Sequence, residues 1–290
     1  MHQPVLLKEI IEILKPKENE NFIDATFGEG NVSFEIAKFN KPDGKILAFE
    51  WDPELYKVGV EKIKNLKMEN RIQLVNKNFK DIKKVVKENG FTKIKGIVFD
   101  LGISLWHYKK SGKGFSFQNE EPLDMRINPE IKVTAFEVIN YYSYKELVEI
   151  FKNYGEEKNA EKIARIIIHQ RKKKKIETSK ELSDIITKVV PFKRIHPATK
   201  VFMALRIFIN KELENLEKGL KDSYDILEKE GKIIVLSFHG LEDRVIKKIF
   251  KFLKLKGAKI ITKHPIKPTK EEIFKNPSSR SAKLRAILKI

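Results

Sequence analysis

The sequence contains no cysteine among its 290 residues, which excludes disulfide bonds, thiolate metal sites and cysteine nucleophiles. It also lacks any run that approaches the roughly 20 apolar residues required by a membrane-spanning helix. The N-terminal stretch MHQPVLLKEIIEILKPKE carries a charge every few residues and therefore differs from a secretory signal peptide. We expect a soluble protein that is located in the cytoplasm and does not contact a membrane.

Acidic residues are scarce relative to basic ones: 40 Asp and Glu stand against 59 Lys and Arg, which gives a formal net charge of +19. A surplus of this size produces an electrostatic field that attracts polyanions. Solubility alone would also explain many exposed lysines, and basic runs such as RKKKK at 171–175 are usually solvated. We favour a nucleic acid partner, with runs of this kind as phosphate contacts.

Short apolar runs alternate with helical patterns over the first hundred residues. The apolar runs lie at 21–26, 45–50, 71–76 and 94–100, and the expected helices lie between them at 31–39, 53–66 and 79–89. This alternation predicts a doubly wound, parallel α/β sheet, whose ligands bind at the carboxyl ends of the strands.

The alternation stops after the fourth strand, because residues 105–199 contain helical patterns and no comparable apolar run. A long helix is expected at about 200–230, and further strands are expected at 231–238, 258–263 and 282–290. We therefore predict a Rossmann-like domain formed by residues 1–104 and 200–290. An all-helical domain of residues 105–199, inserted into it, is expected to recognise the substrate.

The first strand leads into a turn with only two glycines, Gly28 and Gly30, where dinucleotide-binding turns have three. The Gly-Lys-Ser/Thr of a P-loop is also missing. Asp24 precedes the turn and Glu29 lies within it, and both carboxylates would repel a pyrophosphate. S-adenosyl-L-methionine has no phosphate and carries a cationic amino group and a cationic sulfonium, so it suits this acidic turn.

Side chains suited to the same cofactor follow the next three strands. Glu50 ends the second strand, where a carboxylate accepts hydrogen bonds from ribose hydroxyls. Phe79 follows the third strand, and Asp100 ends the fourth. Any one of these carboxylates alone is more often a helix cap or a solvated group. Together with Asp24 they favour a class I methyltransferase over a dehydrogenase.

Nine short motifs occur in the order found in one known family. They are HQPVLL (2–7), DATFGEG (24–30), DLGIS (100–104), GFSF (114–117), EPLDMR (121–126), YGEEK (154–158), HPATK (196–200), ALRIFINKELE (204–214) and SFHGLEDR (237–244). On these motifs the chain resembles, over essentially its full length, the bacterial ribosomal RNA small subunit methyltransferase H family, also called MraW. The resemblance implies a Rossmann-like class I methyltransferase sheet with a helical insert.

The resemblance also implies an activity, a partner and a set of cofactor contacts. The activity is S-adenosyl-L-methionine-dependent N4-methylation of a cytidine, position 1402 in the usual rRNA numbering, in the decoding centre of 16S rRNA. The partner is this rRNA within the small ribosomal subunit. The implied cofactor contacts are Gly30, Asn31 and Val32 at the turn, Glu50 at the ribose, Phe79 and Asp100 around the adenine and methionine, and His107 just beyond the fourth strand. Gly28, the other glycine of the turn, is expected to contact the cofactor as well.

The turn departs from the family pattern, since the family's Gly-Gly-His-Ser is Gly30-Asn31-Val32-Ser33 here. His107 likewise replaces a usual glutamine. These departures keep an alternative open, namely a non-catalytic ribosome assembly factor that binds the cofactor. A methyltransferase acting on another nucleic-acid base is a further alternative.

The N4 amine is a weak nucleophile, because its lone pair is delocalised into the ring, so a proton acceptor beside it would assist the reaction. Asp100 is our candidate for this acceptor, with a purely cofactor-binding role as an equal alternative. His239, at the end of the fifth strand, is a second catalytic candidate, against the ordinary alternative of a structural histidine. No paired metal-ligand spacing occurs, so we expect no metal requirement.

A loop at 106–117 interleaves aromatic rings with cations, which suits an unstacked RNA base and its phosphates. The predicted RNA contacts are Trp106, Lys109, Lys110, Lys113, Phe115, Arg126 and, on the insert, Arg171. For Phe115 the alternative is an anchor of the loop, and for Arg126 an ion pair with Asp124. Arg165, His169 and Arg171 on the insert are expected to share one helical face, as an RNA surface or, in the ordinary alternative, a solvated face. A monomer and a homodimer are both compatible with the sequence.

Overall fold

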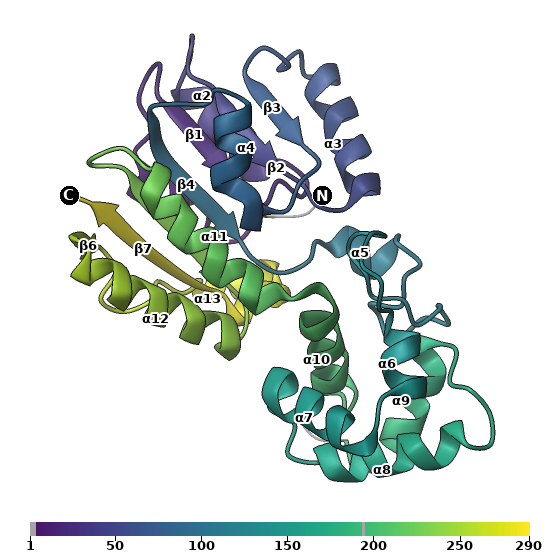
Figure 1. The fold of residues 1–290 in the computed structure, drawn as a ribbon. Coiled ribbons are helices and arrows are strands. Elements are labelled where there is room, and N and C mark those ends of the chain that lie inside the picture. The colour runs from purple at the N-terminus through teal and green to yellow at the C-terminus, as the bar shows by residue number, and fades with distance from the viewer. Residues whose placement is uncertain (1–3, 193–194) are drawn as a thin grey trace. The chain divides into compact units, whose positions relative to one another are not determined.

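The computed structural model describes residues 4–192 and 195–290, so His2 and Gln3 of the first motif lie outside the described residues. Contacts divide the chain into two compact units (Figure 1). Unit 1 comprises Met1–Ile103 and Leu213–Ile290, and unit 2 comprises Ser104–Glu212. The expected division ended the insert at residue 199. Helix α10 (Thr199–Asn210) instead belongs to unit 2, because it packs on α7 (Tyr144–Gly155) of that unit.

Unit 1 is built on a seven-stranded sheet with the order β3-β2-β1-β4-β5-β7-β6. Strands β1 to β5 are parallel, whereas β7 is antiparallel to both β5 and β6. The strands are β1 (Asn21–Asp24), β2 (Ile46–Phe49), β3 (Ile72–Val75), β4 (Ile94–Asp100), β5 (Lys232–Ser237), β6 (Ala258–Ile260) and β7 (Lys283–Lys289). The predicted α/β sheet is confirmed, and each predicted strand occurs within its expected range.

Helices cover both faces of this sheet, which explains why its strands are apolar on both sides. Ile23, Phe49 and Phe99 pack in one core cluster with α4, α11 and α12. Side chains of successive strand residues point to opposite faces of the sheet, so Phe22 and Ile46 pack in a second cluster with α1, α2 and α3. The helices of unit 1 are α1 (Leu7–Leu14), α2 (Asn31–Phe39), α3 (Pro53–Asn65), η1 (Phe79–Asp81), α4 (Ile82–Glu88), α11 (Glu212–Ile226), α12 (Gly240–Leu255), α13 (Lys270–Lys275) and η2 (Pro277–Ser281).

The prediction of one long helix at about 200–230 is wrong. The helix is interrupted at Lys211, whose φ of 50° places it in the left-handed region between α10 and α11. Asn210, the last residue of α10, accepts a hydrogen bond from the Ile127 N–H at 2.8 Å and donates one to the Met125 carbonyl at 2.9 Å. These contacts to a loop that is distant in the sequence stabilise the end of α10. They explain why the helix ends where the sequence has neither glycine nor proline.

Unit 2 is helical, as the sequence predicts. Its helices are α5 (Leu105–Lys109), α6 (Ala135–Tyr141), α7 (Tyr144–Gly155), α8 (Ala160–Arg171), α9 (Ser179–Thr187) and α10 (Thr199–Asn210). Phe151, Ile163, Leu182 and Leu205 are fully buried and supply part of its core. Within the described part of the chain, no helix of either unit combines the length and apolar character needed to cross a bilayer.

Candidate active site

The glycine turn connects β1 to α2, and both glycines have positive φ angles that side chains rarely adopt. At Gly28 (φ 54°) a Cβ atom would meet nothing within 4 Å, so the space above the turn is open. At Gly30 (φ 79°) a Cβ atom would lie 2.5 Å from the Phe34 ring and 2.6 Å from the Phe27 ring. Gly30 is therefore required by packing, whereas Gly28 leaves room for a ligand.

The two residues after the turn begin helix α2. Asn31 is partly exposed. The Val32 side chain is 5% exposed and packs in the core between the sheet and helices α1 to α3. Val32 can therefore reach a ligand only through its backbone N–H, which belongs to the first helical turn, where donors lack intrahelical partners.

The Glu50 carboxylate, directly after β2, is 8% exposed and is held by two backbone donors. Its Oε2 accepts from the Gly28 N–H at 3.1 Å, and its Oε1 accepts from the Asp52 N–H at 2.8 Å. Burial raises the pKa of Glu50 to about 7, a rise that these hydrogen bonds partly offset. The structure thus brings the expected ribose ligand against the expected turn.

Asp24 lies beneath the turn and does not face a ligand, contrary to the expectation that it contributes to an acidic binding surface. Its carboxylate is fully buried, accepts from the Ser33 hydroxyl at 2.7 Å and accepts from the Thr26 N–H at 3.1 Å. Burial raises the pKa of Asp24 to about 6. Asp24 therefore links β1 to the first turn of α2.

Asp100, the last residue of β4, lies beside this link. Its backbone N–H donates to the Thr26 hydroxyl at 2.7 Å. Its carboxylate is partly buried and accepts no hydrogen bond from any residue that the structure describes. Burial, with the nearby carboxylates of Asp24 and Glu242, raises the pKa of Asp100 to about 7. An unpaired carboxylate with this pKa at a strand end is typical of a functional site.

Phe79 begins the 3₁₀ helix η1 after β3 and is partly buried. Its ring lies edge-on to Phe99 of β4, with 5.4 Å between the ring centroids. A Cβ atom at Gly219 of α11 would lie 2.8 Å from the same ring. Phe79 is therefore held between the sheet and α11, which positions it at the strand ends as the resemblance requires.

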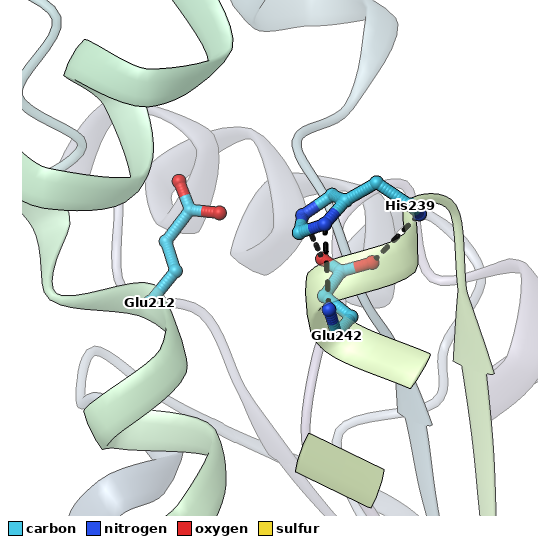
Figure 2. A group of neighbouring side chains, drawn as sticks. All are labelled: Glu212, His239 and Glu242. Atoms are coloured by element: carbon cyan, nitrogen blue, oxygen red, sulfur yellow. Dashed lines mark hydrogen bonds and ion pairs between the residues drawn. The ribbon is translucent and has the colours of Figure 1, made fainter. Parts of the chain in front are cut away.

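His239 directly precedes α12 and acts as its N-cap, together with Glu242 (Figure 2). The ring Nδ1 accepts from the Glu242 N–H at 3.3 Å, and Glu242 Oε2 accepts from the N–H groups of Phe238 at 2.8 Å and His239 at 3.3 Å. The ring Nε2 lies 3.1 Å from Glu242 Oε1 but is not aligned for a hydrogen bond. These contacts give His239 a structural role, and its catalytic role stays a prediction.

The predicted RNA loop lies in unit 2. Lys109 and Lys110 are exposed, and Trp106 is partly exposed at the start of α5. Lys113 is partly exposed and its carbonyl accepts from the Met125 N–H at 2.7 Å, which closes the loop. These four side chains remain predicted RNA contacts.

Two aromatic side chains of this loop are buried. Phe115 is 4% exposed and its ring lies edge-on to His107, which favours the alternative of a loop anchor over stacking on an RNA base. His107 is also 4% exposed, and its Nδ1 lies 3.4 Å from the Ser104 hydroxyl. His107 belongs to unit 2, so its contact with the cofactor stays a prediction.

Both predicted arginine contacts are used inside unit 2. The predicted ion pair is present, since Arg126 donates to both oxygens of Asp124 at 2.7 and 2.9 Å. Its remaining terminal nitrogen donates to the Ile131 carbonyl at 2.9 Å, which leaves few donors for RNA. Arg171 donates to the Ile139 carbonyl at 2.7 Å and is partly buried, which lowers its pKa.

The expectation that Arg165, His169 and Arg171 share one helical face is wrong. Arg165 and His169 are four residues apart and line a common hollow, whereas Arg171 is two residues further and points to α6. Sequence reasoning also missed Thr26 and Ser33, whose hydroxyls connect the end of β1 to β4 and to α2, respectively. Their position directly beside the acidic turn was the available signal.

The structure of unit 1 brings Gly28, Glu50, Phe79 and Asp100 to the carboxyl ends of β1 to β4, the expected ligand edge. The open space at Gly28 and the Glu50 acceptor fit a nucleoside whose ribose donates hydrogen bonds. No lysine of a phosphate-binding loop occurs at the turn. The strand order and the site define a class I methyltransferase.

Comparison with known proteins agrees with this class. The chain belongs to the MraW methylase family, whose model matches residues 1–290. The predicted cofactor, S-adenosyl-L-methionine, is confirmed by membership of this methylase family. A protein of Sulfurihydrogenibium sp. named ribosomal RNA small subunit methyltransferase H is 47% identical over 98% of this chain and 97% of its own. A protein of the same name from Persephonella marina is 45% identical over 100% and 99% of the two chains.

A solved structure of a candidate rRNA methylase from Clostridium thermocellum shares the fold. Its TM-score is 0.51 and its identity is 13%, with 100% of this chain and 98% of that chain covered. At this identity the likeness concerns the fold alone, and it agrees with the sheet topology described above.

Proposed function

We propose that this protein transfers a methyl group from S-adenosyl-L-methionine to the exocyclic N4 of a cytidine in the decoding centre of 16S rRNA, position 1402 in the usual rRNA numbering. Methylation of small-subunit ribosomal RNA is the activity in the names of relatives 39–47% identical to this chain. The net charge of +19 supports a polyanionic substrate. The family resemblance carried by the nine motifs supports the choice of cytidine N4.

The observation that carries the proposed chemistry is the unpaired carboxylate of Asp100 at the end of β4. When bound, S-adenosyl-L-methionine supplies an electrophilic methyl group and a neutral thioether leaving group. Asp100 accepts a hydrogen bond from the N4 amine, which enriches the nitrogen lone pair, and then takes the proton that N4 loses. A carboxylate with a pKa of about 7 is a suitable acceptor near neutral pH.

The remaining residues position the reactants. Glu50, fixed by backbone N–H groups, would accept hydrogen bonds from the ribose hydroxyls of the cofactor. The Thr26 hydroxyl accepts from the Asp100 N–H and thereby fixes the end of β4 relative to β1. Because the cofactor carries the leaving group, most of the rate enhancement comes from such positioning.

The target base must leave its stack before N4 can be methylated. Trp106 and Lys109 lie on α5, and Lys110 directly follows this helix. All three side chains are exposed or partly exposed, and they suit an unstacked base and its phosphates. We propose that these side chains bind the RNA next to the target, whereas Phe115 and Arg126 maintain the shape of the loop.

The proposal is tested by incubating the protein and radiolabelled S-adenosyl-L-methionine with small ribosomal subunits from cells that lack it. Label is expected in 16S rRNA. Asp100→Asn serves as the inactive control. Cofactor binding without any transfer to subunits or to deproteinised rRNA would instead support the non-catalytic assembly factor, and label on another base would support a different target.

A further inference from the structure

Unit 2 contains a hollow of about 550 Å³ that lies outside the candidate active site described above. Its lining comes from one face of α8 and from the two residues that directly follow α9. The lining residues are Lys162, Arg165, Ile166, His169, Lys188 and Val189. All six lining residues belong to unit 2.

In the part of the chain that the structure describes, the cations of this hollow form no ion pairs, although Arg165 attracts Glu161, whose main partner is Lys152. Among the residues that the structure describes, no carboxylate forms an ion pair with Lys162, Arg165, His169 or Lys188. Nearby carboxylates are already paired with other lysines. Glu161 binds Lys152 at 2.6 Å, Asp184 binds Lys180, and Glu181 binds Lys174 at 2.9 Å.

The spacing of these cations matches an extended anion better than a single small one. Lys162, Arg165 and His169 lie at i, i+3 and i+7 of α8, which places them on one face over about 10 Å. Lys188 supplies a fourth cation from the other wall. A row of this length spans roughly two or three successive phosphates of one nucleic-acid strand, which is more than one isolated phosphate requires.

The floor of the hollow indicates which part of a nucleic acid would bind. Ile166 and Val189 are partly buried and apolar, so they can contact the carbon atoms of riboses. His169 is the one aromatic ring among the six lining residues, so the hollow offers no platform of successive rings for stacking bases. Phosphate and sugar contacts fix the position of a nucleic acid without reading its sequence.

We infer that this hollow binds the ribose–phosphate backbone of the substrate RNA, away from the methylated base. The inference rests on the proposed function for its substrate class, and it assigns a separate backbone-binding site to the helical unit. Such a site would hold the RNA in register while α5 contacts the target, and would account for the cations that the family motifs leave without a role.

The test compares two triple variants with equal loss of charge. The first, Lys162→Gln with Arg165→Gln and Lys188→Gln, removes three cations of the hollow. The control, Lys132→Gln with Lys145→Gln and Lys158→Gln, removes three exposed lysines of unit 2 that do not line the hollow. Binding of deproteinised small-subunit rRNA and of small ribosomal subunits is measured at several salt concentrations, and S-adenosyl-L-methionine affinity and thermal unfolding serve as folding controls.

We expect the hollow variant to bind rRNA about tenfold more weakly at moderate salt. The slope of log affinity against log salt should become shallower by about 2, since each phosphate contact contributes roughly 0.7 for a single strand. The control variant should change the slope by less than half as much. Cofactor affinity should be unchanged in both.

Equal losses in the two variants, or no loss in the first, would overturn the inference. Weaker binding to subunits with unchanged binding to deproteinised rRNA would also overturn it, because the partner would then be a ribosomal protein. The measurement concerns binding, so failure of the wild-type protein to transfer a methyl group would contradict the proposed function without deciding this test.

Discussion

The Glu50 carboxylate accepts a hydrogen bond from the Gly28 N–H at 3.1 Å, which connects the end of β2 to the glycine turn after β1. The Asp52 N–H donates to the other oxygen at 2.8 Å. These backbone donors orient the carboxylate, and because a carboxylate has about four acceptor sites, it can still accept from a further donor. The residue that is expected to recognise the ribose is thus positioned by the turn that is expected to hold the rest of the cofactor.

Replacing Glu50 with alanine should weaken S-adenosyl-L-methionine binding by about 1–3 kcal/mol, because the ribose hydroxyls lose a charged acceptor. Titration calorimetry measures this change directly. Glu54→Ala, which removes an exposed carboxylate on the first turn of α3, is the matched control and should leave affinity unchanged. Equal affinity of wild type and Glu50→Ala would rule out the ribose assignment.

Asp100→Asn should lower turnover by roughly 10²–10⁴-fold, because the amide keeps the shape of the side chain but cannot accept the N4 proton. Cofactor affinity should change much less. Single-turnover kinetics and calorimetry on the same preparation separate the two effects. A parallel loss of rate and affinity would show that Asp100 binds cofactor and that another group accepts the proton.

The carboxyl groups at the strand ends make stability depend on pH. Burial raises the pKa of Asp100 and Glu50 to about 7 and that of Asp24 to about 6, whereas the unfolded chain returns them to about 4. The folded state therefore binds more protons than the unfolded state between about pH 4 and pH 7. Its stability falls as pH rises through this window.

We therefore expect the cofactor-free protein to be less stable at pH 8 than at pH 5.5. Asp100→Asn should reduce this fall by about 1–2 kcal/mol, because one group no longer has to ionise in a partly buried site. Denaturant unfolding at the two pH values measures the difference. Asp43→Asn, at an exposed position, should leave the difference in unfolding free energy between the two pH values unchanged. If both variants behave alike, the raised pKa of Asp100 is refuted.

His239→Ala should lower the free energy of unfolding by about 1 kcal/mol through loss of the α12 cap, and His239→Asn should recover it, since asparagine caps helices well. Thermal or denaturant unfolding measures both variants. Turnover provides the second readout. Recovery of turnover by asparagine assigns His239 to capping alone, whereas loss of turnover in two stably folded variants supports the catalytic prediction.

The sequence predicts much of unit 1 because its strands are buried on both faces and therefore read as short apolar runs. The expected helix at 31–39 coincides with α2. The break at Lys211 could not be predicted, because the side chain of Asn210 and a loop 83 residues away determine it. The reversed direction of β7 was equally hidden, since an apolar run does not encode the direction of its strand.

The chemical types of the site residues were visible in the sequence, but their environments were not. Asp24 and Asp100 both end strands, and the sequence alone gives them similar roles. The structure separates them, because the Ser33 hydroxyl and the Thr26 N–H bind the Asp24 carboxylate and no described residue donates to that of Asp100. Such a difference depends on side chains that meet only after folding.

The central claim, N4-methylation of one cytidine by this protein, is tested most directly by mass-spectrometric mapping of 16S rRNA. Small subunits from cells that lack the protein are incubated with the purified protein and S-adenosyl-L-methionine, and the rRNA is then digested to nucleosides and oligonucleotides. The account predicts one added methyl group on N4 of cytidine 1402, formed far more slowly when Asp100→Asn replaces the wild type. A methyl group on any other nucleotide or atom, or none at all, would contradict it.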